Sequence, residues 1–328
     1  MTLLHIPASA AQGIWARRAQ YAPVAALVGA VVLWSSSFVG MKLALRELAP
    51  LSVIWLRLAF AMAVIVPVIW PKLRPVAHRE GRGAFSRYQR GDALWLLVVA
   101  LFLPCLYFTL ESYALRYTSA SAAGTISALM PLMVAVAATV FLQERLSLSM
   151  VGGLLLSCIG VGWLTYAGTP SEHGPMPLLG NALECAAMAA AAGYTLGVRK
   201  LSGRYDPWVL AGVQNSMGLV WFLPGMLLSG IPDVSLGSAV WPNIWPNLLA
   251  VVYLGVAVSL GAFWCYSYAL AQVTAARASA YVNMVPVVTL LLSWLVLDEQ
   301  LSGWQYAGCA VVLAGVCLSQ GIFGGTRR

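Results

Sequence analysis

The sequence predicts an all-α integral membrane protein with ten transmembrane helices arranged as two inverted five-helix repeats. This prediction rests on the composition, an internal repeat and the distribution of basic residues. Of the 328 residues, 60% are hydrophobic and only 9% are charged, against roughly 25% charged residues in an average soluble domain. A soluble chain of this length cannot bury so much apolar surface, so the solvent is expected to be lipid.

The internal repeat covers nearly the whole chain. Residues 107–161, moved by 155 positions, align with 262–316 without a gap, and upstream a shift of 157 aligns Lys42 with Arg199. The shared positions include a Ser-Tyr-Ala-Leu run at 112–115 and 267–270, a proline (Pro131 and Pro286), a glutamate (Glu144 and Glu299) and two glycines (Gly153 and Gly308, Gly160 and Gly315). A repeat of this extent describes the architecture rather than a local motif.

The first copy supplies five candidate spans, since about 20 apolar residues cross the hydrocarbon core. They are 22–44, 51–70, 92–115, 118–142 and 148–168. Segment 1–21 precedes them as a cytoplasmic N-terminal stretch, Pro50 opens the second span, and the basic stretch 71–91 separates the second from the third. Gly168 ends the fifth span, as expected for a residue that stops helices.

The second copy supplies five more spans at matching spacing. They are 176–199, 207–229, 244–270, 273–297 and 303–321. Pro207 and Gly303 begin the seventh and tenth spans. The predicted domains are therefore a first repeat at 22–168, a linker at 169–175, a second repeat at 176–321 and a cytoplasmic tail at 322–328.

Basic residues predict the orientation. With the N-terminus in the cytoplasm, 15 of the 19 Lys and Arg residues fall in cytoplasmic segments, three fall outside, and Arg57 lies within a span. By the positive-inside rule both termini are cytoplasmic. Because each copy has an odd number of spans, the second copy enters the membrane from the opposite side. Inverted repeats give two similar packings, open to opposite sides, around a site at mid-membrane, which is the physical basis of alternating access.

The motifs resemble those of the EamA-type drug/metabolite transporters over about 22–321. They are a Trp-Ser-Ser-Ser-Phe run at 34–38, Arg57 seven positions after Pro50, and Pro131 thirteen positions before Glu144. The resemblance implies a ten-helix secondary transporter, usually an exporter of amino acids, related metabolites or drugs. It also implies a central cavity lined by spans 1, 3, 4, 6, 8 and 9. The second copy departs from the first, because the shift of 157 takes Trp34 to Ala191 and Arg57 to Gln214.

Three ionisable residues lie clearly within predicted spans, namely Arg57, Glu111 and Glu184. Each is costly in a bilayer and needs a physical reason. One interpretation is a mutual ion pair. A second is a carboxylate that loads and releases a proton, with Arg57 modulating it. A third is recognition of a substrate amine or carboxylate. These three are the candidate coupling residues.

Polar and aromatic residues of the cavity-lining spans are the candidate substrate-binding residues: Trp34, Ser37, Tyr107, Glu111, Trp264, Tyr268 and Asn283. The alternative is that the aromatics only pack or anchor the protein at the membrane interface. Likewise, the serines near Trp34 could bond to their own helix.

Pro131 and Pro286 are the candidate gating residues. Each removes a backbone hydrogen bond and is expected to free the carbonyl four residues earlier, at Ser127 and Val282. A freed carbonyl at mid-membrane could bind a ligand, and the kink could act as a hinge. The alternative is that these prolines only kink their helices.

Other function classes lack their motifs. The sequence has no GxxxxGK[ST] and no HExxH, its cysteines show no metal-binding spacing, and its histidines lie in predicted loops. An enzyme, a cofactor, a metal and a nucleic-acid partner are therefore not expected. The sequence predicts a multi-pass transporter of the bacterial inner (plasma) membrane, acting on a small molecule, with a homo-oligomer as one possibility. The alternative is a non-transporting membrane sensor or assembly subunit.

Overall fold

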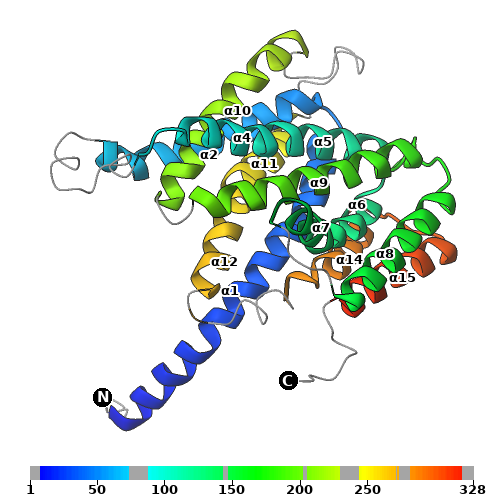
Figure 1. Cartoon of the computed structure of the whole chain (residues 1–328), viewed down its shortest axis with the longest axis horizontal. Coiled ribbons are helices and arrows are strands. Elements are labelled where there is room, and N and C mark those ends of the chain that lie inside the picture. The colour runs from blue at the N-terminus through cyan, green and yellow to red at the C-terminus, as the bar shows by residue number, and fades with distance from the viewer. Residues whose placement is uncertain are drawn as a thin grey trace, which may run out of the picture.

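The computed structural model describes residues 8–73, 88–142, 147–201, 205–229, 244–270, 272 and 281–319, and in these ranges it contains helices and no β-strand (Figure 1). The first copy contributes α1 (Ala8–Ala44), α2 (Pro50–Leu73), α4 (Asp92–Ala100), η1 (Leu101–Leu106), α5 (Tyr107–Tyr117), α6 (Ala120–Ile126), η2 (Ser127–Leu129), α7 (Met130–Leu142) and α8 (Leu148–Tyr166). The second contributes α9 (Pro177–Leu201), α10 (Pro207–Ser229), α11 (Ile244–Tyr253), η5 (Leu254–Ala262), α12 (Phe263–Leu270), α14 (Val285–Leu297) and α15 (Gly303–Ser319).

Within the described residues, 6 helical segments are long and apolar enough to cross a membrane. They are Tyr21–Ala44, Pro50–Leu73, Asp92–Tyr117, Ala120–Ala137, Leu148–Tyr166 and Trp245–Ala269. Two shorter apolar helices are Val285–Leu297 and Gly303–Ser319. All eight coincide with predicted spans, so the protein is a multi-pass helical membrane protein. The helices α9 and α10 lie at the sixth and seventh predicted spans, and the total of ten crossings stays a prediction.

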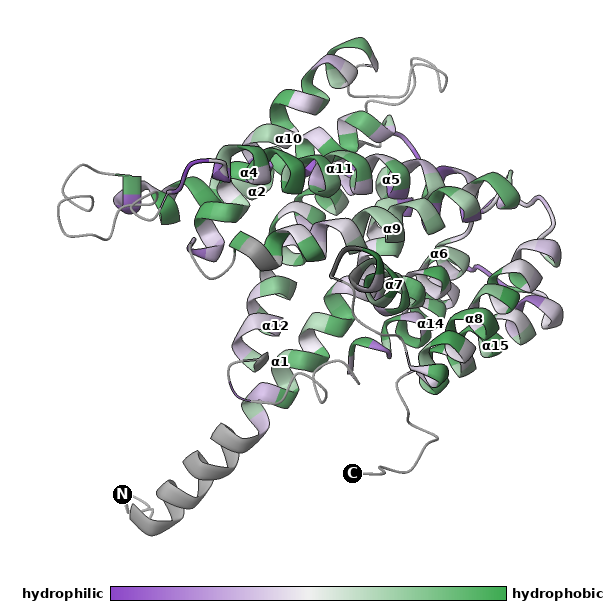
Figure 2. Ribbon diagram, viewed as in Figure 1, coloured by the Kyte–Doolittle hydropathy of each residue, from purple (hydrophilic) through white to green (hydrophobic). Residues whose placement is uncertain are grey.

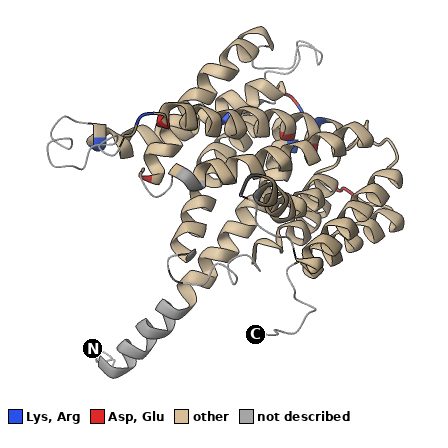
Figure 3. Cartoon of the chain, in the orientation of Figure 1, with Lys and Arg blue, Asp and Glu red and all other residues tan. Residues whose placement is uncertain are grey.

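The helix surfaces are apolar on the outside as well as within. Hydrophobic residues dominate the ribbon (Figure 2), and charged residues are sparse along it (Figure 3). Leu155, Val220, Leu228 and Leu249 are all more than half exposed. Such outward-facing side chains would be unfavourable in water, and they are expected where lipid is the solvent.

The fifth and tenth predicted spans, α8 and α15, pack directly against each other through the repeated glycines (Figure 1). A Cβ on Gly160 would lie 2.6 Å from the backbone nitrogen of Val312, and one on Gly308 would lie 2.8 Å from that of Leu164. The hydroxyl of Ser157 also donates to the carbonyl of Val312 at 3.2 Å. Small residues thus allow backbone-to-backbone approach, which is a main source of helix association in lipid.

Irregular helical segments occupy equivalent positions in the two copies. The shift of 155 that aligns the copies takes η1, at 101–106, to 256–261, which lies within η5. In η1, Leu103 leaves the helical region with φ −142° and ψ 119° just before Pro104. Because of this break η1 is a kink between two helical stretches, whereas η5 is a π-helical segment, a type that occurs often at functional sites.

Predicted loops of the same side meet at the same end of the molecule. At one end, Lys72 forms an ion pair with Asp206 and Tyr205 donates to Asp92 at 2.7 Å. At the other, which we call the outer end, segments 115–121, 171–176 and 298–300 meet.

Partial burial raises the pKa of Asp206, but hydrogen bonds from Lys72 and the backbone of Trp208 lower it more, so its pKa is below the ordinary value.

Candidate functional site

The three ionisable residues predicted within spans come together in one buried cluster. Arg57 is on α2, Glu111 on α5 and Glu184 on α9, and all three are buried. Arg57 lies close enough to Glu111 for an electrostatic interaction, and Glu111 lies equally within such range of Glu184. The cluster exists because α5 packs along α9 and α2 packs against α5.

Arg57 is held by groups from both copies. Its Nε–H donates to Ser259 Oγ at 3.0 Å, and Ser259 in turn donates to the carbonyl of Leu254 at 2.9 Å, within η5. The guanidinium carbon lies 4.3 Å from the centre of the Phe108 ring, a cation–π contact. Gly255 lets η5 approach so closely, because a Cβ there would be 2.6 Å from the carbonyl oxygen of Arg57. Arg57 therefore connects η5 with the segment that follows η1.

Glu111 is held by a tyrosine rather than by the arginine. The hydroxyl of Tyr107, one turn earlier on α5, donates to Glu111 Oε1 at 2.6 Å. Among the described residues the ion pair shorter than 4 Å joins Lys72 to Asp206, and Arg57 reaches neither buried carboxylate at that distance. Arg57 and Glu111 thus do not form the direct ion pair considered from the sequence, and they interact over more than 4 Å.

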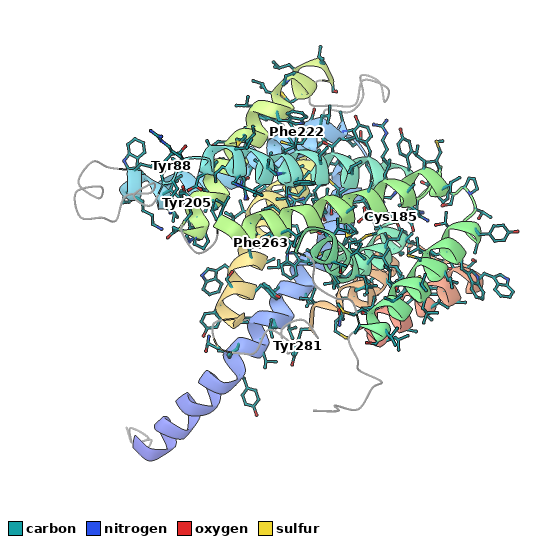
Figure 4. The ribbon with its side chains drawn as sticks, in the orientation of Figure 1. Tyr88, Cys185, Tyr205, Phe222, Phe263 and Tyr281 are labelled. Carbon is teal, nitrogen blue, oxygen red and sulfur yellow. The ribbon has the colours of Figure 1, made fainter. Side chains whose placement is uncertain are left out.

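Glu184 is the most deeply buried member of the cluster. It is 0% exposed, and neither carboxylate oxygen has a hydrogen-bond partner. Its neighbour Cys185 marks the place on α9 in Figure 4. A buried ionised carboxylate without a partner is strongly disfavoured, so Glu184 requires a proton or a bound cation.

The predicted wall aromatics separate into two groups. Trp34 on α1 packs against Phe263 and Tyr266 of α12, with ring centres 5.7 and 5.2 Å apart. Trp264 and Tyr268 instead stack on each other at 5.6 Å on an exposed face of α12, where Trp264 is 58% exposed. The structure therefore brings Trp34 together with Phe263 and Tyr266, which the substrate-binding prediction had not included.

The remaining candidate residues either lie where a helix is interrupted or form a hydrogen bond within their own helix. The hydroxyl of Ser37 donates to the carbonyl of Trp34 at 2.6 Å, the local bond considered as its alternative. Asn283 lies in the turn before α14. Pro131 follows the 3₁₀ turn η2, and Pro286 is in the first turn of α14. Regular helix is thus interrupted at both prolines.

Sequence reasoning missed Ser259, which holds Arg57. A serine in an apolar stretch carries no signal of its own, and its partner is 202 positions away in sequence. Tyr266, by contrast, is marked in the sequence, because the repeat aligns it with Glu111. In the described part of the chain, no three His, Cys, Asp or Glu side chains gather as a metal site would require.

Comparison with known proteins gives a family for this architecture. The model of the EamA-like transporter family matches twice, over residues 22–166 and 178–320. The uncharacterized transporter YcxC of Bacillus subtilis is 28% identical, over 85% of this chain and 86% of that protein. An uncharacterized transporter of Archaeoglobus fulgidus is 27% identical, over 87% of this chain and 94% of that protein. A crystal structure at 20% identity has the same fold, with a TM-score of 0.56 over 90% of this chain and 96% of that chain.

Proposed function

Because this chain belongs to the EamA-like transporter family, we propose that it is a secondary active transporter that exports small amphipathic metabolites by alternating access. The substrates are amino acids or related compounds, with drugs as a further class. The membrane is the bacterial inner membrane, with both termini in the cytoplasm.

The observation that carries this proposal is a buried cation and a buried carboxylate without direct partners of opposite charge. Arg57 donates its Nε–H to the neutral hydroxyl of Ser259, and among the described residues it has no carboxylate within 4 Å. Glu184 has no hydrogen-bond partner among these residues at either oxygen. A ligand carboxylate would satisfy Arg57, and a ligand ammonium would satisfy Glu184 or Glu111. Such pairing offsets the desolvation of both groups.

Helix packing around the cluster supports alternating access. Neighbours recur in pairs that the repeat makes equivalent: α1 packs on α14 as α7 packs on α9, and α2 packs on η5 as α10 packs on η1. Two copies with equivalent neighbours have two near-equal arrangements, and this is what a rocking motion about a central site needs.

Coupling is proposed to use the two carboxylates. Glu184 requires a proton or a cation when the substrate is absent. Glu111 lies close enough to disfavour a second negative charge on Glu184. Loading a cationic group would therefore displace a proton, which couples movement to the proton gradient. Exchange of one substrate for another is the alternative. The sequence motif needed for ATP hydrolysis is absent.

The test is uptake of labelled amino acids into proteoliposomes under an imposed pH gradient. We expect flux with the wild-type protein, and we expect Glu184→Gln to lose the dependence of flux on the gradient. Glu172→Gln, which changes an exposed carboxylate of the linker, is the matched control and should behave as wild type.

Two outcomes would contradict the proposal at different levels. If Glu111→Gln and Glu184→Gln both keep the wild-type pH profile, the carboxylates do not carry the proton. If the wild-type protein moves none of the amino acids, related metabolites or drugs under any gradient, a sensor or assembly subunit is the better interpretation.

A further inference from the structure

At the outer end, Glu299 joins the two copies. It follows α14, and its carboxylate accepts three hydrogen bonds from the first turn of α6. The backbone N–H of Ala120 donates to Oε1 at 3.0 Å, and the backbone N–H and hydroxyl of Ser121 both donate to Oε2 at 2.9 Å. Glu299 is 3% exposed. A carboxylate at a helix N-terminus satisfies N–H groups that have no partner within the helix, and it interacts favourably with the helix dipole.

Lys42, in the last turn of α1, holds the other side of the same turn. Its ammonium donates to the carbonyls of Leu115 at 2.6 Å and of Thr118, where α5 ends, and to that of His173 in the linker. The charges of Lys42 and Glu299 also attract each other. The connection between α5 and α6 is thus held between a cation on its α5 side and an anion on its α6 side.

A cavity of about 270 Å³ borders this contact. Its lining includes Thr118, His173, Asn181 and Glu299, together with the start of α6. The next turn of α6 is not part of this lining and is fully buried. There Thr125 is 0% exposed, and its hydroxyl lies 3.4 Å from the sulfur of Cys309 on α15.

We propose that Glu299, Lys42 and the first turn of α6 form a latch that closes the outer end and must break for the substrate to leave. The inference rests on the alternating access of the proposed function, but it concerns a gate remote from the substrate cluster. Charge-assisted hydrogen bonds suit such a gate, because they are strong when closed and can be replaced by water when the end opens. Opening would move α6 away from α15 and expose Cys309.

The test measures how fast Cys309 reacts with a membrane-impermeant maleimide added outside intact cells. The other cysteines (Cys105, Cys158, Cys185, Cys265 and Cys317) are first replaced by alanine. We expect slow labelling in the wild-type background and labelling roughly tenfold faster in Glu299→Ala, since several charge-assisted bonds are lost together. Ser121→Ala, which removes one of the three bonds, should give a smaller increase.

Asp298→Asn is the matched control. It changes the neighbouring carboxylate, which is exposed and has positive φ, a conformation that asparagine tolerates. The latch is wrong if Glu299→Ala is labelled at the wild-type rate, or if Asp298→Asn accelerates labelling as much. Acceleration seen only in inverted vesicles would also overturn it, since the gate would then be cytoplasmic.

Two features of the experiment keep its result interpretable: substitute variants, and a readout that does not depend on transport. If Glu299→Ala does not purify as a monodisperse protein, Glu299→Gln and Ser121→Ala decide, since the first keeps the side-chain shape and the second removes a single hydroxyl. Labelling also needs no transport. Faster labelling without wild-type flux would refute the proposed function and the role of the latch in substrate exit, while still showing that the Glu299 contact closes this end. Flux without faster labelling would refute the latch alone.

Discussion

Single residues in the centre of this protein have partners from distant parts of the chain. Arg57 lies over Phe108 and donates to Ser259, so one guanidinium contacts the third span of each copy. Glu184 has no hydrogen-bond partner among the residues that the structure describes. The two copies have diverged here, because the residue equivalent to Arg57 is Gln214. Polar groups left unsatisfied within a bilayer are the expected contact points of a ligand.

At the residue scale, we expect alanine substitution of Trp34 and of Trp264 to affect substrate affinity differently. Trp34→Ala should weaken substrate binding by roughly 1–3 kcal/mol, through lost apolar contact with the ligand. Trp264→Ala should change binding little, because that ring is on an exposed face. Equilibrium binding of a labelled substrate to the purified variants measures both. If neither variant loses affinity, these aromatics only pack, and the binding site is elsewhere.

Pairs of helices in this protein are held together by two kinds of contact, one made by glycines and one by a carboxylate. The helices α8 and α15 bring Gly153 and Gly160 against Gly315 and Val312 at backbone distance. By contrast, α6 is joined to the end of α14 through the Glu299 carboxylate. A tight glycine contact has no room to slide, whereas a polar contact can open into water. The first pair is therefore expected to stay together while the second changes.

At the element scale, a methyl group on Gly160 should destabilise the protein. Its Cβ would lie 2.6 Å from a backbone nitrogen of α15, and overpacking of this kind costs about 1–3 kcal/mol. Gly162→Ala is the matched control on the same helix, because a Cβ there meets nothing within 4 Å. Thermal unfolding in detergent compares the two. Equal melting temperatures for both variants would show that α8 and α15 are not packed this closely.

The whole molecule places loops predicted on the same side at the same end. Lys42, the end of α5 and the linker meet at one end, and Lys72 meets Asp206 at the other. The described loops that the positive-inside rule predicts on one side therefore lie at one end, and the ten-span order remains a prediction. Which end faces the cytoplasm follows from the basic residues alone.

At the scale of the whole molecule, both termini and the 71–91 stretch should be reachable only from the cytoplasm. Cysteines introduced at 71–91 and in the linker at 169–175 should react from opposite sides of the membrane, with only the linker labelled in intact cells. Labelling of 71–91 from outside would overturn the orientation and the inverted arrangement drawn from it.

The sequence by itself determined three things: that the helices lie in lipid, that the chain contains an internal repeat, and which charged residues lie within the spans. These depend on composition and on spacing along one chain, so they can be read without knowing how helices pack. The described helices lie at the predicted spans, and the repeat reappears as two matches to one family. Arg57, Glu111 and Glu184 were identified because a charge within an apolar span is rare.

Only the tertiary structure decided which groups meet. The contact of Arg57 with Ser259, of Trp34 with Phe263 and Tyr266, and of Glu299 with the start of α6 each join residues far apart in sequence. Such contacts depend on how each helix is rotated about its axis and on where it crosses its neighbours. In lipid, apolar residues cover nearly every face of a helix, so hydrophobic periodicity does not fix that rotation. Small-residue packing and polar contacts between helices fix it instead.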